Sequence, residues 1–408
     1  MIRRYLWMSL LFNVNLVYGQ FYKENNDTSF IRIAESNNTF ALSLYKNIIK
    51  ENDKNIVFSP LSFSTAFSML YAGSNKNTEK EIKSVFGFQE NDSLKHHKAY
   101  GEFLNKLQKY QNENLHIANA LWLQKKYSFL PSYQRIIEQY YKSNIFSVDF
   151  SDINTHKKIN DWGKKNSKGI LEKILQSYNP LFKVVINNIA LFDAKWEKTF
   201  NTSNTKNDIF YTQDAQVSVP FMQENQDVLY RNKDSIITLG LFYKDYKATM
   251  IIMMPLKEKK MEHLEKNIEE YWKKTSESFD NEKIMYMKSD LKFESALVRL
   301  PKFKINTKLA DPISTMIKMG VREAFNDNAD FSRITEKKAG LQVQVLEHIC
   351  EMEFDETGTR IAAATSIALV ERGGSRLQVK IDRPFIFIIV DNESTNVMFM
   401  GKVNNPSK

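Results

Sequence analysis

The chain of 408 residues is long enough to bury a large core, and its 28 Phe and 18 Tyr exclude an intrinsically disordered protein. Its net charge of +9 comes from basic residues interspersed with acidic ones, so neither a basic tail nor a nucleic-acid-binding motif is indicated. Because no repeat and no linker rich in proline, glycine or serine divides the chain, we expect one large domain over residues 20–408.

The first 19 residues are predicted to be a secretory signal peptide. Arg3 and Arg4 supply the positive start, residues 5–18 are mostly apolar, and Gly19 ends a group of compact residues suited to cleavage. No later apolar run is long enough to span a membrane, so we expect a secreted, extracellular protein. Five N-glycosylation sequons agree with export and predict a glycoprotein, at Asn26, Asn37, Asn91, Asn201 and Asn392.

Helices are predicted in the first third of the chain. Apolar residues at helical spacing indicate one helix over residues 40–49, and Ser59 with Pro60 begins a second. Thr78 starts a capping-box sequence for a third helix. In a fourth helix, over residues 94–110, four lysines share the face opposite the apolar residues, namely Lys95, Lys98, Lys106 and Lys109.

Strands are predicted mainly in the later part of the chain. The expected strands are residues 116–124, 184–192, 239–256, 297–305, 341–354, 377–390 and 397–403. Within the run 341–354, His348 and Cys350 fall on the apolar side, which predicts that both are interior. Helices early in the chain and long strands late predict an α+β fold with large antiparallel or mixed sheets.

No motif for catalysis is present in the sequence. There is no zinc-binding His-Glu-x-x-His, no phosphate-cradling glycine loop and no Gly-x-Ser-x-Gly elbow. The six histidines show no ligand spacing beyond the adjacent His96 and His97, which helix packing explains better than a metal. Cys350 is the only cysteine, and its apolar neighbours would raise the pKa of its thiol and leave it inert. We therefore predict that the protein is not an enzyme and needs no metal or cofactor.

The most informative segment begins at Glu356. Gly358 gives the backbone freedom where a strand could end, a run of very small side chains follows, and Arg372 stands further on, directly before two glycines. No proline lies between Glu356 and Arg372, so every residue keeps an N–H that could join a β-ladder. Taken alone, the segment could also be an Ala-rich linker or a surface helix.

The rest of the chain favours a different interpretation of this segment. Six stretches, in order, resemble landmarks of the serpin family, at residues 55–62, 188–196, 298–303, 324–325, 329–332 and 379–389. The resemblance covers nearly the whole chain. It implies a single-domain α+β serpin fold, with several helices around large β-sheets and an exposed reactive-centre loop at about residues 356–378.

The resemblance also implies a serine protease inhibitor that acts as a suicide substrate. Arg372 lies sixteen residues after Glu356, where the family places the residue before the bond that is cut. A cationic side chain there suits the carboxylate-lined pocket of a trypsin-like serine protease, and Gly373 would allow close approach; Arg376 is the rival. Cleavage of the Arg372–Gly373 bond would leave the protease in a covalent complex with a monomeric inhibitor, while the upstream segment inserts into the main sheet.

Insertion makes demands on the hinge, which comprises Glu356, Gly358, Thr359, Arg360, Ile361, Ala362, Ala363 and Ala364. By alternation, the residues expected to face the core are Thr359, Ile361, Ala363, Thr365, Ile367 and Leu369. Those expected to face solvent are Arg360, Ala362, Ala364, Ser366 and Ala368. Ile361 departs from the small residue that the family prefers and would slow insertion. The alternative is therefore a non-inhibitory serpin, acting as a carrier or binding protein.

Further sites follow from the resemblance. Ser59, Asn188 and His348 match a polar cluster beneath the strands that must part, and Trp196 matches a residue near the point where the loop inserts. Each could instead be an ordinary core residue. Some serpins bind sulfated polysaccharide through the helix equivalent to residues 94–110, so its lysines suggest a polyanion partner. A solvated face is the simpler alternative, since an acidic residue lies in the same arc.

Overall fold

The computed structural model describes residues 28–49, 54–89, 92–257, 260–279, 290–336, 340–360 and 377–408. The predicted signal peptide lies outside the described residues, as do Asn26 and Asn91. The same holds for the segment that contains Ile361, Ala362, Ala363, Ala364, Arg372 and Gly373. The hinge is therefore described from Glu356 to Arg360.

The N-terminal helices form as the apolar periodicity predicts, although one begins earlier than expected. They are α2 (Thr28–Ile48), α3 (Pro60–Gly73), α4 (Lys76–Phe86) and α5 (Ser93–Gln111). Ser59 caps α3, since its hydroxyl accepts a hydrogen bond from the N–H of Ser62. The capping box predicted at Thr78 is wrong, because Asn75 caps α4 and the Thr78 hydroxyl instead donates to Glu323 at 3.2 Å.

Two sheets make up the β structure of the described residues. The seven-stranded sheet runs β3 (Asn144–Val148), β2 (Leu115–Gln124), β4 (Val184–Phe192), β12 (Val345–Phe354), β13 (Gly358–Arg360) and β5 (Ala194–Lys195), with β11 (Phe303–Lys308) also paired to β12. The nine-stranded sheet runs β1 (Ile56–Phe58), β16 (Val397–Val403), β15 (Phe385–Asp391), β9 (Ala248–Pro255), β8 (Ile236–Phe242), β7 (Gln216–Lys233), β10 (Lys292–Pro301) and β14 (Leu377–Lys380), with β6 (Lys206–Tyr211) paired to β7.

Three of the predicted strands are in fact pairs of strands. The run 239–256 folds into the antiparallel hairpin of β8 and β9, and its turn contains no glycine or proline to signal it. Asp245 takes a positive φ of 59° in that turn. The run 297–305 divides between β10 and β11, which belong to different sheets, and the run 377–390 divides into β14 and β15.

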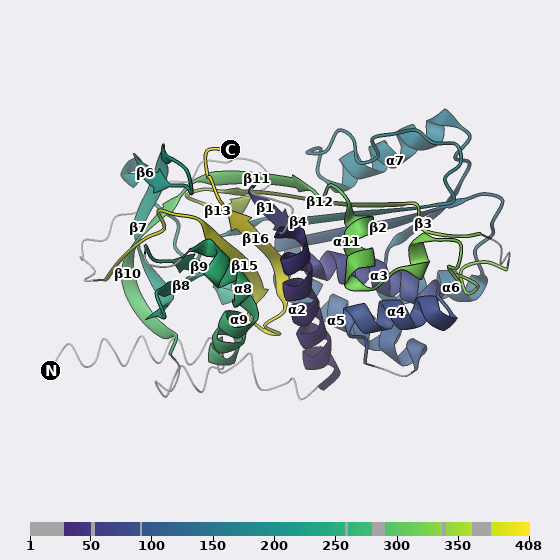
Figure 1. Ribbon diagram of the computed structural model, residues 1–408, viewed down its shortest axis with the longest axis horizontal. Coiled ribbons are helices and arrows are strands. Elements are labelled where there is room, and N and C mark those ends of the chain that lie inside the picture. Colours follow the sequence, from purple (N-terminus) through teal and green to yellow (C-terminus); the bar gives the residue numbers. More distant parts are fainter. Residues whose placement is uncertain are drawn as a thin grey trace.

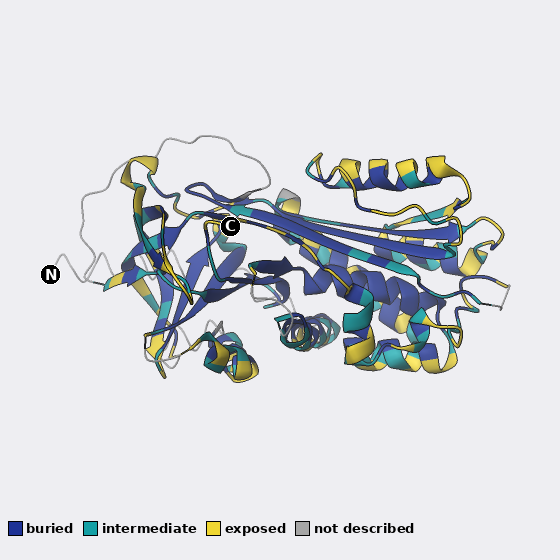
Figure 2. Ribbon diagram, turned by 45° about the horizontal axis from the view of Figure 1, so that its top comes forward, coloured by how far each residue is buried: buried dark blue, intermediate teal, exposed yellow. Residues whose placement is uncertain are grey.

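Helices cover the seven-stranded sheet on both faces (Figures 1 and 2). On one face lies α7 (Ile153–Asn166), whose Ile159 and Trp162 pack in one apolar cluster with Val185 and Ile189 of β4. On the other face lies α3, every residue of which is buried. The other α-helices of the described residues are short, and they are α6 (Pro131–Ile136), α8 (Met261–Lys266), α9 (Ile268–Ser276) and α11 (Pro312–Met319). Within the described part of the chain, no helix combines the length and apolarity required to cross a membrane.

Candidate functional site: the strand pair β4 and β12

The centre of the seven-stranded sheet is a parallel pair, β4 and β12, which we call the seam. Over its length β4 pairs directly with β12, with Asn188 opposite His348 and Asn187 opposite Glu347. At one end a third strand, β13, lies between β12 and β5 and pairs antiparallel with both. The hinge therefore already forms the first residues of a strand that is aligned with the seam.

Thr359 is the innermost residue of this short strand whose side chain is described. It lies opposite Phe354 of β12 and Ala194 of β5, and its side chain is fully buried, in agreement with the predicted inward orientation. Its hydroxyl shares a 2.6 Å hydrogen bond with that of Tyr243. The Tyr243 ring stacks on Trp196 with their centroids 4.6 Å apart. Trp196 thus lies directly beside the buried part of the hinge.

A tight turn at residues 355–358 connects β12 to the hinge strand β13. Asp355 accepts hydrogen bonds from the backbone N–H groups of Thr357 at 2.8 Å and Gly358 at 3.3 Å. Trp196 donates its indole N–H to the Asp355 carbonyl and its backbone N–H to the Thr357 carbonyl, both at 2.9 Å. A Cβ at Gly358 would collide with the Ala194 carbonyl oxygen, so only glycine allows the two backbones to approach this closely. Sequence reasoning missed Asp355 and Tyr243, neither of which belongs to a recognisable motif.

Glu356 anchors the start of the hinge through its side chain and its backbone. Its carboxylate accepts hydrogen bonds from Lys302 Nζ at 2.8 Å and the Thr205 hydroxyl at 2.7 Å, and its carbonyl accepts from the Phe200 N–H at 2.8 Å. Burial acts to raise the pKa of Glu356, but the bonds from Lys302 and Thr205 outweigh it and hold the pKa below its usual value. The hinge is therefore held by an ionised carboxylate at neutral pH.

A buried polar cluster joins the seam to α3. His348 and Asn188, which are partners in the seam, are hydrogen-bonded through Nδ1 and Oδ1. The Ser59 N–H donates to His348 Nε2 at 3.2 Å, so the imidazole proton is on Nδ1. Asn188 Nδ2 donates to the Ser62 hydroxyl at 2.6 Å and also bonds Asn119. The structure thus brings Ser59, Asn188 and His348 together and adds Ser62 and Asn119, which the sequence did not single out.

His348 and Cys350 are both fully buried, as the strand alternation predicts. Burial lowers the pKa of His348 to about 3. Burial also raises the pKa of the Cys350 thiol, whose Sγ lies 3.4 Å from His348 Nε2. The imidazole is therefore neutral in the folded protein, which lets Nε2 accept the Ser59 N–H.

We expect acid to destabilise the closed seam through His348. Its pKa is about 3 when folded and 6.5 in the reference state, so the unfolded chain binds the extra proton below pH 6.5. From this histidine alone, the free energy of unfolding should then fall by about 1.4 kcal/mol for each unit by which the pH is lowered below 6.5. Urea unfolding between pH 7 and pH 4 measures the slope, and His348→Gln should reduce it by one proton's contribution. The pKa values of His96 and His97 are also lowered by burial, so part of the slope should remain. An equal slope in the variant would contradict the assignment.

Two of the predicted glycosylation sites fit the structure poorly. Asn37 is only 2% exposed, and its Nδ2 donates to Asn396 Oδ1 at 2.7 Å and to the Val397 carbonyl at 2.9 Å, so the folded chain offers no accessible amide for a glycan there. Asn392 is half-buried, and its Nδ2 donates to the Tyr246 carbonyl at 2.8 Å. Asn201 begins a surface turn in which its Oδ1 accepts from Ser203, which leaves it the best placed of the described sequons.

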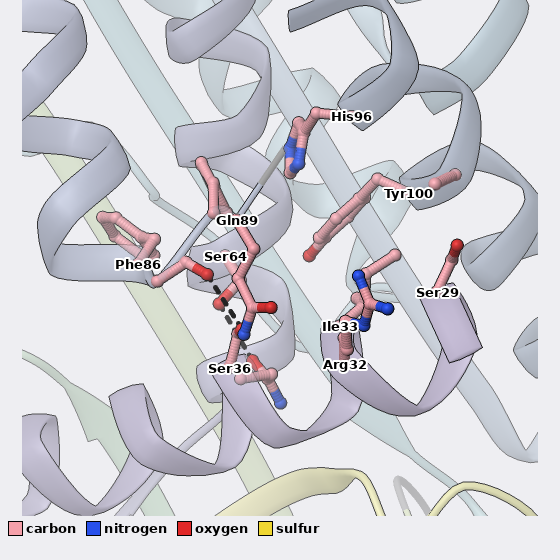
Figure 3. Close-up of a pocket in the computed structure, with 13 residues that line it drawn as sticks. Ser29, Arg32, Ile33, Ser36, Ser64, Phe86, Gln89, His96 and Tyr100 are labelled. Atoms are coloured by element: carbon pink, nitrogen blue, oxygen red, sulfur yellow. Dashed lines mark hydrogen bonds between the residues drawn. The ribbon is translucent and has the colours of Figure 1, made fainter. Parts of the chain in front are cut away.

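The predicted polyanion face lies on α5. Lys95, Lys98 and Lys109 are exposed, whereas the Lys106 ammonium lies 5.2 Å from the centre of the Phe30 ring and is partly covered. A small pocket opens where α2, α4 and α5 meet, lined among others by Arg32, Ser29, His96 and Tyr100 (Figure 3). Arg32 is exposed and adds a cation that the sequence analysis did not include.

The described fold places the short strand β13 between β12 and β5, at one end of the seam. The family model described as "Serpin (serine protease inhibitor)" matches residues 35–406, so the chain belongs to the serpin family. Serine proteinase inhibitor 2.4 of Apodemus sylvaticus is 30% identical over 390 residues, covering 92% of this chain and 90% of the relative. Human alpha-1-antichymotrypsin is 30% identical over 405 residues, covering 95% and 92% respectively.

Solved structures agree on the fold. The thermophilic serpin tengpin in its native state superposes with a TM-score of 0.79 at 26% identity, covering 94% of this chain and 95% of that one. Human thyroxine-binding globulin superposes with a TM-score of 0.77 at 26% identity, covering 93% of this chain and 100% of that one. The predicted single-domain α+β serpin fold is confirmed, within a family that contains both inhibitors and non-inhibitory members.

Proposed function

We propose that the protein is a secreted suicide inhibitor of a trypsin-like serine protease, with Arg372–Gly373 as the bond that the protease cuts. The observation that carries this proposal is the position of Thr359, which is buried and paired on both sides at the end of the seam. A hinge held there needs only to continue along the same line for the loop to become a full strand. The proposal rests on the sequence for Arg372, which lies outside the described residues.

The chemistry would begin with attack of the protease serine on the carbonyl carbon of Arg372. The Arg372–Gly373 peptide bond breaks and an ester joins Arg372 to the serine. The proton of the serine hydroxyl passes through the protease histidine to the nitrogen of Gly373, which leaves as a new amino terminus. If the upstream segment inserts before water hydrolyses the ester, the protease is carried along and its active site is distorted. The loop must therefore insert faster than water hydrolyses the ester.

The test is incubation of the purified protein with trypsin, followed by denaturing electrophoresis and thermal melting. We expect a covalent complex that survives detergent, and a loop-cleaved protein that melts well above the intact one because the closed sheet has gained a strand. Chymotrypsin serves as the control, since Arg372 does not suit its apolar pocket. Clean cleavage with no complex would contradict the proposed inhibition, and cleavage without a gain in melting temperature would contradict insertion itself.

The second candidate is a non-inhibitory serpin that acts as a carrier or binding protein. Ile361 favours it, since a β-branched residue near the start of the inserting segment would slow insertion, and thyroxine-binding globulin shares the fold. Such a protein would give cleavage without a trapped enzyme in the same experiment. A sulfated polysaccharide is a further proposed partner, supported by the exposed Lys95, Lys98 and Lys109 on α5.

A further inference from the structure

The surface formed by α7 and the segment that follows it is rich in lysine. Residues 152–173 contain six lysines against three acidic residues, a net charge of +3, out of +9 for the whole chain. All six lysines are exposed, and none of them forms an ion pair within the part of the chain that the structure describes. They are Lys157, Lys158, Lys164, Lys165, Lys168 and Lys173.

Four of these lysines lie in two parallel rows on the outer side of α7. Positions seven residues apart fall on nearly the same side of a helix. Lys157 and Lys164 therefore form one row, and Lys158 and Lys165 form the other, each about 10 Å long. Lys168 follows just beyond the end of the helix. We call these five residues the α7 lysine face, and Figure 2 shows the exposed surface of α7 turned away from the sheet.

The inner side of α7 is fixed to the rest of the protein. Ile159 and Trp162 pack in the apolar cluster that includes β4. Asn160 Oδ1 accepts hydrogen bonds from the backbone N–H groups of Ile174 and Leu175, both at 2.9 Å, which fastens the segment after the helix against it. The α7 lysine face is therefore carried by a packed element, so its charges are already arranged before any partner binds.

Helix stability does not account for these lysines. In the last turn, Lys164 and Lys165 offset the negative end of the helix dipole. Lys157 and Lys158 lie in the first half of the helix, where the dipole gives them no such role. Asp161 lies four residues from both Lys157 and Lys165, a spacing that permits ion pairs, yet it forms none with any described residue. The positive charge of the face is thus available to an anionic partner.

The residue types of the face favour a sulfated polysaccharide over other polyanions. A helix that binds a membrane surface needs apolar side chains beside its cations, but the only exposed large apolar residue of α7 is Ile153, at its first position. Single-stranded nucleic acid is bound by exposed aromatic rings, and Trp162, the one large aromatic residue of α7, is buried. Rows of compact ammonium groups suit sulfate groups repeated along a chain.

We propose that the α7 lysine face binds a sulfated polysaccharide, at a site separate from the one proposed on α5. The inference rests on the proposed function only for the class of partner, since it requires neither cleavage nor insertion of the loop. The helix α5 packs on α3, where the Tyr100 and Thr65 hydroxyls are 3.3 Å apart. Because α3 and α7 cover opposite faces of the seven-stranded sheet, the two lysine faces point away from each other (Figure 1).

The experiment measures heparin binding by calorimetry in a protein whose α5 face is already weakened by Lys95→Ala and Lys98→Ala. Adding Lys157→Ala and Lys164→Ala removes one row of the α7 lysine face. We expect this to weaken binding about tenfold to thirtyfold, since each lysine near an anionic surface contributes about fivefold. The dependence of the affinity on salt should also decrease.

A matched control removes the same charge elsewhere. Lys266→Ala with Lys273→Ala, on the exposed surface of α8 and α9, should leave the affinity nearly unchanged. Asp161→Asn provides the opposite test, because it removes the acidic group that lies between the two rows and should tighten binding about threefold to fivefold.

Equal affinities in the α7 variant and in the matched control would overturn the inference. If heparin binding is lost on weakening α5 alone, the proposed α5 site stands and the inference fails. If the wild type binds no heparin, both proposed sites fail together, while trapping of trypsin still decides the inhibitor proposal on its own. Equally strong binding of single-stranded DNA or of phosphatidylserine vesicles would overturn the assignment to a sulfated polysaccharide.

Discussion

Replacing Arg372 with alanine is expected to abolish trapping of trypsin-like proteases. The guanidinium would be the only group of the loop paired with the buried carboxylate at the base of the protease pocket. Truncating one partner of such a pair costs about 2–5 kcal/mol, so the association rate constant with trypsin should fall about thirtyfold to several thousandfold. Rates of inhibition under pseudo-first-order conditions measure the effect.

The rival cation provides the matched control. Arg376→Ala removes the same charge four residues further on and should leave inhibition of trypsin unchanged. Mass spectrometry of the fragment released from the wild type should give residues 373–408. Loss of inhibition in Arg376→Ala with activity retained in Arg372→Ala would overturn the assignment of the bond.

Replacing Thr359 with arginine is expected to turn the inhibitor into a substrate. The Thr359 side chain is fully buried against Tyr243 between β5 and β12, so an arginine there would bury a charge that has no carboxylate partner. Such burial costs several kilocalories per mole, and insertion should slow by about a hundredfold or more. Trypsin would then hydrolyse the acyl-enzyme, and the number of inhibitor molecules consumed per trapped enzyme should rise steeply.

Thr359→Ser is the control for this second change. It keeps the hydroxyl that bonds Tyr243 and adds no charge, so trapping should persist at close to the wild-type stoichiometry. The intact Thr359→Arg protein should also lose the protection of its hinge against proteolysis, because an arginine cannot occupy the site between β5 and β12. A variant that still traps trypsin one to one would show that trapping does not require position 359 to be buried between β5 and β12.

Features that depend on neighbouring residues were predicted correctly, whereas features that depend on contacts between distant residues were not. Strands such as Val184–Phe192 were predicted with correct limits, because a run of mostly apolar residues needs only its own sequence to identify it. The strand predicted over 239–256 was wrong because a turn made of lysine, aspartate and tyrosine carries no glycine or proline signal. The strand β7 was missed because polar residues occupy its middle, where pairing with β10 satisfies the backbone.

The candidate site shows the same division. Ser59, Asn188 and His348 could be proposed from the resemblance, but Ser62, Asn119 and Tyr243 join the site only through contacts between distant parts of the chain. The sequon at Asn37 illustrates the converse. Its three-residue motif is complete, yet the fold buries the amide against β16.

The sequence alone determined the family, the α+β class, the small side chains of the hinge and the position of Arg372, because each depends on residue types at fixed spacing. Only the tertiary structure decided that Thr359 is already paired within the sheet and that the His348 imidazole in the seam is buried and neutral. The physical reason is that strand pairing and burial join residues more than a hundred positions apart, and no local pattern encodes which of them meet.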